Sequence, residues 1–156
     1  MLGFGLLIAA AVVVADQATK WAALAALDPM GAPIAVTPFF NLVLVWNRGV
    51  SFGMLGGLSG YGPWLLSAVA LAIVVFLLTW LRREPGPLVA GALGLVIGGA
   101  LGNVIDRVRF GAVVDFLDFH YAGYHWPAFN VADAAICVGA GLLLLSGLFA
   151  PQRQAT

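Results

Sequence analysis

The stretch GPWLLSAVALAIVVFLLTWL, from Gly62 to Leu81, contains no charged side chain. Its length matches the roughly 20 apolar residues that a helix needs to cross the hydrocarbon core of a bilayer. Three other segments have similar length and character, at about residues 2–27, 87–105 and 131–149. The sequence therefore predicts four transmembrane helices with both chain ends on the same side of the membrane.

The composition also indicates an integral membrane protein. The 156 residues are 62% hydrophobic and only 9% charged, whereas a typical soluble domain is about 25% charged. Seven basic residues balance seven acidic ones, so no excess of positive charge favours nucleic acid as a partner. The lone Cys137 excludes an intramolecular disulfide and offers no Cys/His cluster for a metal. We expect one domain over residues 1–156, with no metal and no cofactor.

The segment between the first two spans has a different character. TPFFNLVLVWNRGVSFG, at residues 37–53, is rich in aromatic and β-branched residues with glycines at its turns. We expect a small β-structured element over about residues 34–53, at the membrane interface. The stretch between spans three and four, residues 107–127, is also aromatic, and we interpret it as a loop. The predicted fold class is therefore a membrane all-α protein with a small β element.

The arginines give a prediction of orientation. Three fall on each side of the predicted spans: Arg82, Arg83 and Arg153 on one, and Arg48, Arg107 and Arg109 on the other. If the second trio is held in a site, the positive-inside rule assigns the short connection RREPG, residues 82–86, to the cytoplasm. Both chain ends are then cytoplasmic as well.

Several acidic residues lie in or beside the predicted spans, where a charge is costly. Asp16 and Lys20 share one helical face at i, i+4, as a structural pair or as part of substrate handling. Asp106 precedes Arg107 at the end of span three, which favours a structural role. We interpret Asp118 as a solvated residue of the aromatic loop.

Asp115 and Asp133 differ from these acids because neither has a basic residue beside it in the sequence. Both are predicted at the same interface. Two carboxyl groups close together in a half-dry site do not both ionise easily, so one keeps its proton. Such a pair suits an acid–base peptide hydrolase, and it also fits a pathway for protons or cations.

Five motifs follow one another along the chain: DQATK (16–20), NRGVSFG (47–53), GGALGNVIDR (98–107), GAVVDF (111–116) and PAFNVADAAI (127–136). In this order they resemble the bacterial lipoprotein signal peptidases, or signal peptidase II. The resemblance implies an aspartyl endopeptidase of the bacterial inner membrane, with cytoplasmic termini, four transmembrane helices and an extracytoplasmic β-cradle. Its substrates would be diacylglyceryl-modified prolipoproteins, cut before the lipidated cysteine.

The resemblance also assigns roles to residues. The catalytic pair falls on Asp115 and Asp133, at the extracytoplasmic face. Residues matching support or substrate-binding positions are Asp16, Lys20, Asn47, Gly49, Asn103, Asp106, Arg107, Asn130 and Ala132. Asn130 is also a candidate N-cap of span four. The implied partners are prolipoprotein substrates and membrane lipid, and we expect a monomer.

Two other functions are compatible with a small polytopic protein. A proton-coupled transporter or channel subunit would carry acids at mid-membrane depth and internal repeats, whereas these acids gather at one interface. A non-catalytic assembly factor would tolerate the loss of Asp115 or Asp133.

Overall fold

The computed structural model describes residues 1–49, 61–84 and 86–148, and it contains four long helices. They are α1 (Leu2–Ala26), α2 (Gly62–Arg83), α3 (Pro87–Phe110) and α4 (Val131–Leu148). Each is long and apolar enough to cross a membrane. Four membrane helices with a small antiparallel sheet confirm the predicted fold class.

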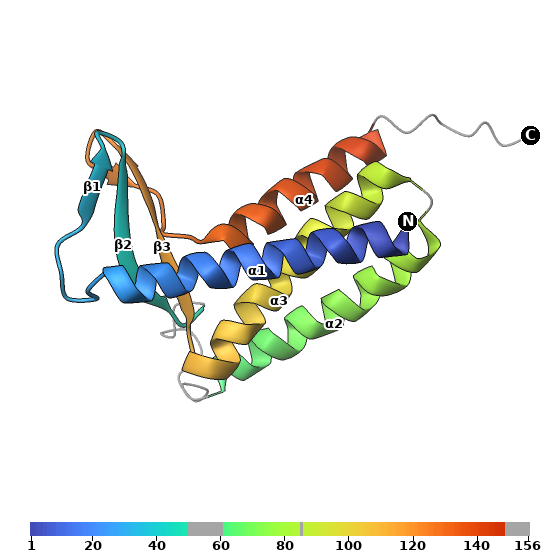
Figure 1. Cartoon of the computed structure of the whole chain (residues 1–156), viewed down its shortest axis with the longest axis horizontal. Helices are drawn as coiled ribbons and strands as arrows, with labels where there is room; N and C mark the ends of the chain where they lie inside the picture. The colour runs from blue at the N-terminus through green and yellow to red at the C-terminus, as the bar shows by residue number, and fades with distance from the viewer. Residues whose placement is uncertain (50–60, 85, 149–156) are drawn as a thin grey trace, which may run out of the picture.

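Helix α3 is the centre of the bundle and packs against α1, α2 and α4 (Figure 1). In its apolar window 56% of the residues are buried inside the protein, against 22% or less for the other three helices. Its glycines allow this close packing. A methyl group on Gly98 would lie 2.6 Å from the carbonyl oxygen of Ala9, and one on Gly102 would lie 2.5 Å from Asp16 Oδ2. Both contacts are too short for any side chain. Gly98 therefore lets the backbones of α1 and α3 approach closely, and Gly102 leaves room for the Asp16 carboxylate.

Four strands form one antiparallel sheet in the order β1-β2-β3-β4. They are β1 (Ile34–Thr37), β2 (Phe40–Asn47), β3 (Val113–Tyr121) and β4 (Tyr124–His125). The sheet lies across one end of the helix bundle, while the described ends of α1 and α4 reach the opposite end (Figure 1). The start of α1 and the end of α4 thus lie on the same side of the bundle, as four spans require.

The interpretation of residues 107–127 as a loop is wrong. Helix α3 continues to Phe110 and stops at Gly111, whose φ of 68° and N–H bond to the Arg107 carbonyl make a left-handed helix cap. The next residues, VVDFLDFHY, form β3 in the interior of the sheet. Pairing with β2, far away in the sequence, provides the hydrogen bonds that make this aromatic stretch a strand. Of the predicted β segment, residues 50–53 lie outside the described part of the chain.

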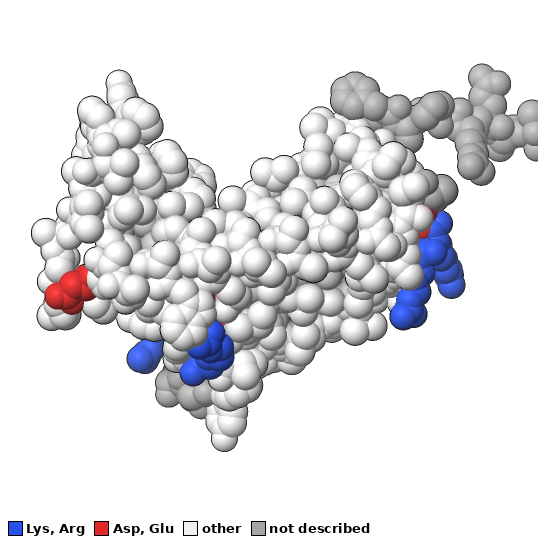
Figure 2. Space-filling model, viewed as in Figure 1, with Lys and Arg blue, Asp and Glu red and all other residues white. Residues whose placement is uncertain are grey.

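Charged side chains on the visible face gather at the two ends of the molecule (Figure 2). Between these ends the surface of the bundle in this view shows no Lys, Arg, Asp or Glu. Such an uncharged belt across this face of the helices is what a bilayer-spanning bundle presents to lipid.

Candidate active site

A buried polar network occupies the region where α1, α3 and α4 meet strand β3. Its central cation is Lys20, only 2% exposed, whose Nζ lies 2.8 Å from both Asp16 Oδ2 and Asp106 Oδ2. The same Nζ donates a hydrogen bond of 3.0 Å to Asn103 Oδ1. The predicted pair of Asp16 and Lys20 is therefore present, and the ion-pair partner of Asp106 is Lys20 from another helix.

The two carboxylates beside Lys20 also accept backbone hydrogen bonds from other elements. Asp16 Oδ1 accepts one from the N–H of Ala132 in α4 at 2.9 Å. Asp106 Oδ2 accepts one from the N–H of Val114 in β3 at 3.0 Å. One cation and two carboxylates thus join three helices and the sheet, and Ala132 contributes through its backbone.

Asn130 connects Asp115 with Asp133. Its Oδ1 accepts the N–H of Asp133 at 3.0 Å, and its own N–H donates to Asp133 Oδ2 at 3.2 Å. This reciprocal pair is a capping box at the start of α4, so the predicted N-cap is confirmed. The side-chain Nδ2 of Asn130 also donates to Asp115 Oδ1 at 2.6 Å. A single asparagine therefore holds both acids.

Two further asparagines contact one acid each. Asn103 Nδ2 donates to Asp133 Oδ1 at 2.7 Å, and Asn47 Nδ2 donates to Asp115 Oδ2 at 2.8 Å. Asn47 is itself oriented by the N–H of Gly49, which donates to its Oδ1 at 2.9 Å. Gly49 has a φ of +87°, and a Cβ there would collide with Leu66. This position therefore requires glycine.

The two acids have different surroundings. Asp115 is 1% exposed, whereas Asp133 is partly open to the surface. Burial raises the pKa of Asp115 from 3.8 to about 6, and the charge of Asp133 adds to the rise, although hydrogen bonds from Asn47 and Asn130 act against it. Two interacting carboxyl groups with separated proton affinities are able to act as a base and an acid in one reaction.

The structure brings most of the predicted site residues into one hydrogen-bonded network. Its members are Asp16, Lys20, Asn47, Gly49, Asn103, Asp106, Asp115, Asn130, Ala132 and Asp133. Arg107 lies nearby and acts through its charge on Asp133, Asp106 and Asp115. Its Nε is buried and has no hydrogen-bond partner among the described residues.

Sequence reasoning missed one member of the network, Gln17. Its Nε2 donates to Asp106 Oδ1 at 3.0 Å, to Asp16 Oδ2 at 3.3 Å and to the carbonyl of Gly102 at 3.3 Å. The signal available was a polar amide beside Asp16 inside a membrane helix, where an unpaired amide is costly.

The interpretation of Asp118 as solvated is wrong. It lies in β3 directly opposite Asn41, whose Nδ2 donates to Asp118 Oδ2 at 2.9 Å. Nδ1 of His125 lies 2.9 Å from Asp118 Oδ1. Burial opposes ionisation, but the hydrogen bonds from Asn41 and His125 and the charge of His125 hold the pKa of Asp118 below its ordinary value. This cluster lies farther along the strand and shares no hydrogen bond with the network around Lys20.

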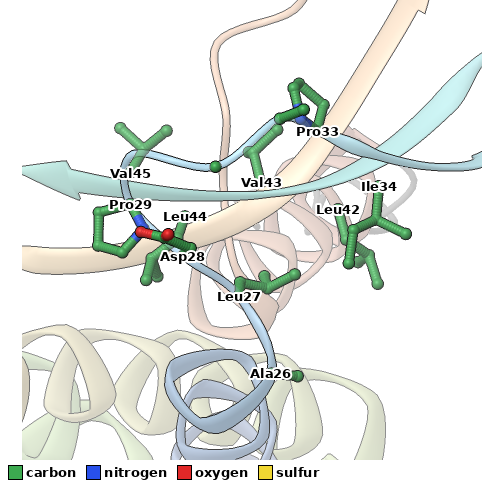
Figure 3. Close-up of a pocket in the computed structure, with 12 residues that line it drawn as sticks. Ala26, Leu27, Asp28, Pro29, Pro33, Ile34, Leu42, Val43, Leu44 and Val45 are labelled. Carbon is green, nitrogen blue, oxygen red and sulfur yellow. The ribbon is translucent and has the colours of Figure 1, made fainter.

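A separate cavity of about 380 Å³ lies between the end of α1 and strand β2 (Figure 3). Ala26, Leu27, Pro33 and Leu42 line it, with Asp28 at the loop after α1. None of its lining residues belongs to the polar network. In the described part of the chain, no three His, Cys, Asp or Glu side chains group to hold a metal ion.

Comparisons with known proteins give a consistent result. A family model described as signal peptidase (SPase) II matches residues 8–149. The lipoprotein signal peptidase of Polynucleobacter necessarius is 49% identical over 140 residues, covering 89% of this chain and 85% of the relative. That of Syntrophotalea carbinolica is 50% identical over 144 residues, covering 90% and 88%, and that of Methylorubrum extorquens is 47% identical over 154 residues, covering 97% and 90%.

Solved structures with the same fold are bacterial membrane enzymes. One, solved by the in meso method at 1.9 Å, superposes with a TM-score of 0.82 and 33% identity, covering 96% of this chain and 95% of the other. A second, at 2.3 Å, gives a TM-score of 0.78 and 32% identity, covering 99% and 95%.

Proposed function

The chain belongs to the signal peptidase II family of aspartic peptidases, and we propose that Asp115 and Asp133 are the carboxyl groups with which it cleaves prolipoprotein signal peptides. The observation that carries this proposal is the position of Asn130, which hydrogen bonds to both acids at once. The family membership does not favour the transporter or channel alternative.

The reaction needs one acid ionised and the other protonated. The carboxylate takes a proton from water while the water oxygen bonds to the scissile carbonyl carbon, and the protonated acid gives its proton to the carbonyl oxygen. The first acid then gives its proton to the leaving nitrogen as the C–N bond breaks, and the second recovers a proton from a hydroxyl of the intermediate. The products are a carboxylic acid and an amine, and both acids return to their starting states.

We propose diacylglyceryl-modified prolipoproteins as substrates, cut before the lipidated cysteine. The network lies where the helices meet the sheet, at one end of the uncharged belt (Figures 1 and 2). A peptide anchored by acyl chains in the bilayer would present its scissile bond at this depth. The lipid anchor would contribute to catalysis by positioning the carbonyl.

The orientation proposed for the enzyme follows from the two ends of the bundle. Arg82 and Arg83 lie in the last turn of α2, at the end opposite the sheet. The positive-inside rule assigns that end to the cytoplasm. The termini are then cytoplasmic and the catalytic pair is extracytoplasmic, in a monomer formed by one domain.

The supporting residues divide into three proposed groups. Asp16, Lys20 and Asp106 hold the helices and the strand together, and Asn103 and Asn130 orient the acids. Asn47, Gly49 and Arg107 are proposed to contact substrate.

The test is cleavage of a diacylglyceryl-modified prolipoprotein in detergent, followed by gel shift. Wild type should cut, and folded Asp115→Asn and Asp133→Asn should not. If Asp115→Asn still cuts while a folded Asp106→Asn does not, the pair is misassigned. If wild type fails on authentic lipidated substrate, the substrate assignment itself is wrong.

A further inference from the structure

Lys20 is a buried cation to which peptide hydrolysis gives no direct task. Its Nζ does not contact Asp115 or Asp133, and the closest link to the pair is its bond to Asn103 Oδ1. The question is what this bond does to the neighbouring acid.

The bond fixes the orientation of the Asn103 amide. An ammonium group only donates hydrogen bonds, so the side of Asn103 that faces Lys20 must be its oxygen. Asn130 Nδ2, at 3.2 Å from the same oxygen, adds a second donor there. The amide nitrogen of Asn103 consequently points at Asp133 Oδ1, 2.7 Å away. A flipped amide would set N–H groups against Lys20 and an oxygen against the carboxylate.

Asp133 is surrounded by groups that stabilise a negative charge. Both of its oxygens accept N–H bonds, from Asn103 and from the backbone of Asn130. It lies in the first turn of α4, where the helix dipole favours an anion. The Arg107 guanidinium also lies near enough for its charge to interact with that of Asp133.

Asp115 has the opposite setting. It lies on a strand, is almost fully buried and faces the negative charge of Asp133. Burial and a neighbouring anion both favour the neutral form of a carboxyl group. The hydrogen bonds from Asn47 and Asn130 and the charge of Lys20 reduce this preference, but they do not reverse it.

We propose that Lys20 is a positioning residue that, through Asn103, makes Asp133 the ionised general base and leaves the proton on Asp115. This inference rests on the proposed catalytic pair and adds which of the two acids is ionised and which is protonated. Asp133 takes the proton from water, and Asp115 gives its proton to the carbonyl oxygen. The remaining charged groups of the cluster are Asp16, Asp106 and Arg107, and the first two are paired with Lys20.

The first test is the pH profile of kcat/KM for cleavage of the lipidated substrate. If Asp133 is the base, the acidic limb reports its deprotonation in the free enzyme. Asn103→Leu removes the directed N–H bond, and Lys20→Met removes the cation that orients it. Both should move that limb to higher pH by about one unit. Asn103→Leu leaves the ion pairs of Lys20 intact. It therefore tests the positioning role even if Lys20→Met does not fold.

Gln17→Met is the matched control. Gln17 hydrogen bonds to the same Asp16 and Asp106 as Lys20, but it does not touch Asn103. It should lower thermal stability while leaving the acidic limb in place. An equal shift of the limb in Gln17→Met, or no shift in a folded Asn103→Leu, overturns the positioning role.

The second test locates the proton by infrared difference spectroscopy at about pH 5, below the pKa of Asp115, which burial raises to about 6. The carbonyl stretch of a protonated carboxyl group should disappear in Asp115→Asn and persist in Asp133→Asn. The reverse pattern overturns the charge order while leaving the catalytic pair in place. Failure of the pair itself would be seen separately, as cleavage by either Asp→Asn variant.

Discussion

Strand β3 contains two buried aspartates, three residues apart, with similar local contacts and opposite electrostatics. Asp115 accepts an amide hydrogen bond from Asn47 of β2, and Asp118 accepts one from Asn41 of the same strand. The additional partners differ: Asp115 faces a second carboxyl group, and Asp118 faces His125. Burial, with the charge of Asp133 added, raises the pKa of Asp115 to about 6, whereas for Asp118 the hydrogen bonds from Asn41 and His125 outweigh burial and lower the pKa. A strand and an asparagine do not make a reactive acid: the depth of burial and the charge of the neighbouring partner decide.

The largest expected difference between the two acids is in the cleavage rate after each is exchanged for its amide. Asp115→Asn should reduce cleavage by about a thousand-fold or more, because a general acid–base group is lost. Asp118→Asn should cleave at close to the wild-type rate, since Asp118 belongs to another cluster. Initial rates in the gel-shift assay measure both. Comparable losses in the two folded variants would contradict the difference drawn between them.

The next effect concerns the stability of the two clusters. Lys20→Met leaves Asp16 and Asp106 buried without their cation, which should lower the free energy of unfolding by about 3–5 kcal/mol. Thermal unfolding of the purified protein in detergent measures the change.

His125→Gln is the matched substitution in the Asp118 cluster. His125 is 54% exposed, so its ion pair is screened by solvent and should contribute no more than about 1 kcal/mol. A loss of stability as large as that of Lys20→Met would show that the sheet cluster is also a structural centre.

A smaller effect is the pH dependence of stability, which should have opposite signs for the two acids. The raised pKa of Asp115 means that the folded state holds its proton more tightly than the unfolded state. Between about pH 4 and about pH 6, this group therefore lowers stability as pH rises, by about 3 kcal/mol at most. Asp115→Asn removes that loss, so the gap between variant and wild type should widen in favour of the variant up to about pH 6.

Asp118 gives the converse trend. Its lowered pKa contributes stability above the unfolded value, and this contribution is lost as pH falls through the folded value. Asp118→Asn should therefore lose stability relative to wild type at neutral pH and lose less in acid. Melting temperatures of both variants across this range check the signs, and parallel curves would contradict them.

The partners of the acids show which contacts the sequence predicts and which it does not. The capping role of Asn130 follows from its place before an apolar helix, and the pairing of Asp16 with Lys20 follows from their i, i+4 spacing. Both are contacts within one turn of chain. Asp118 was misjudged, because its partner Asn41 is 77 residues away and only the register of β2 with β3 brings them together.

The sequence by itself determined the four helices, which put the start of α1 and the end of α4 on one side, and, through five motifs, the family. These properties depend on runs of apolar residues or on short local patterns, which can be recognised in the sequence alone. The tertiary structure alone decided that β3 completes the sheet and that Lys20 neutralises Asp106 and orients Asn103, 83 residues away. The physical reason is that a buried charge or amide must find a partner, and which partner it finds depends on how the helices and strands pack.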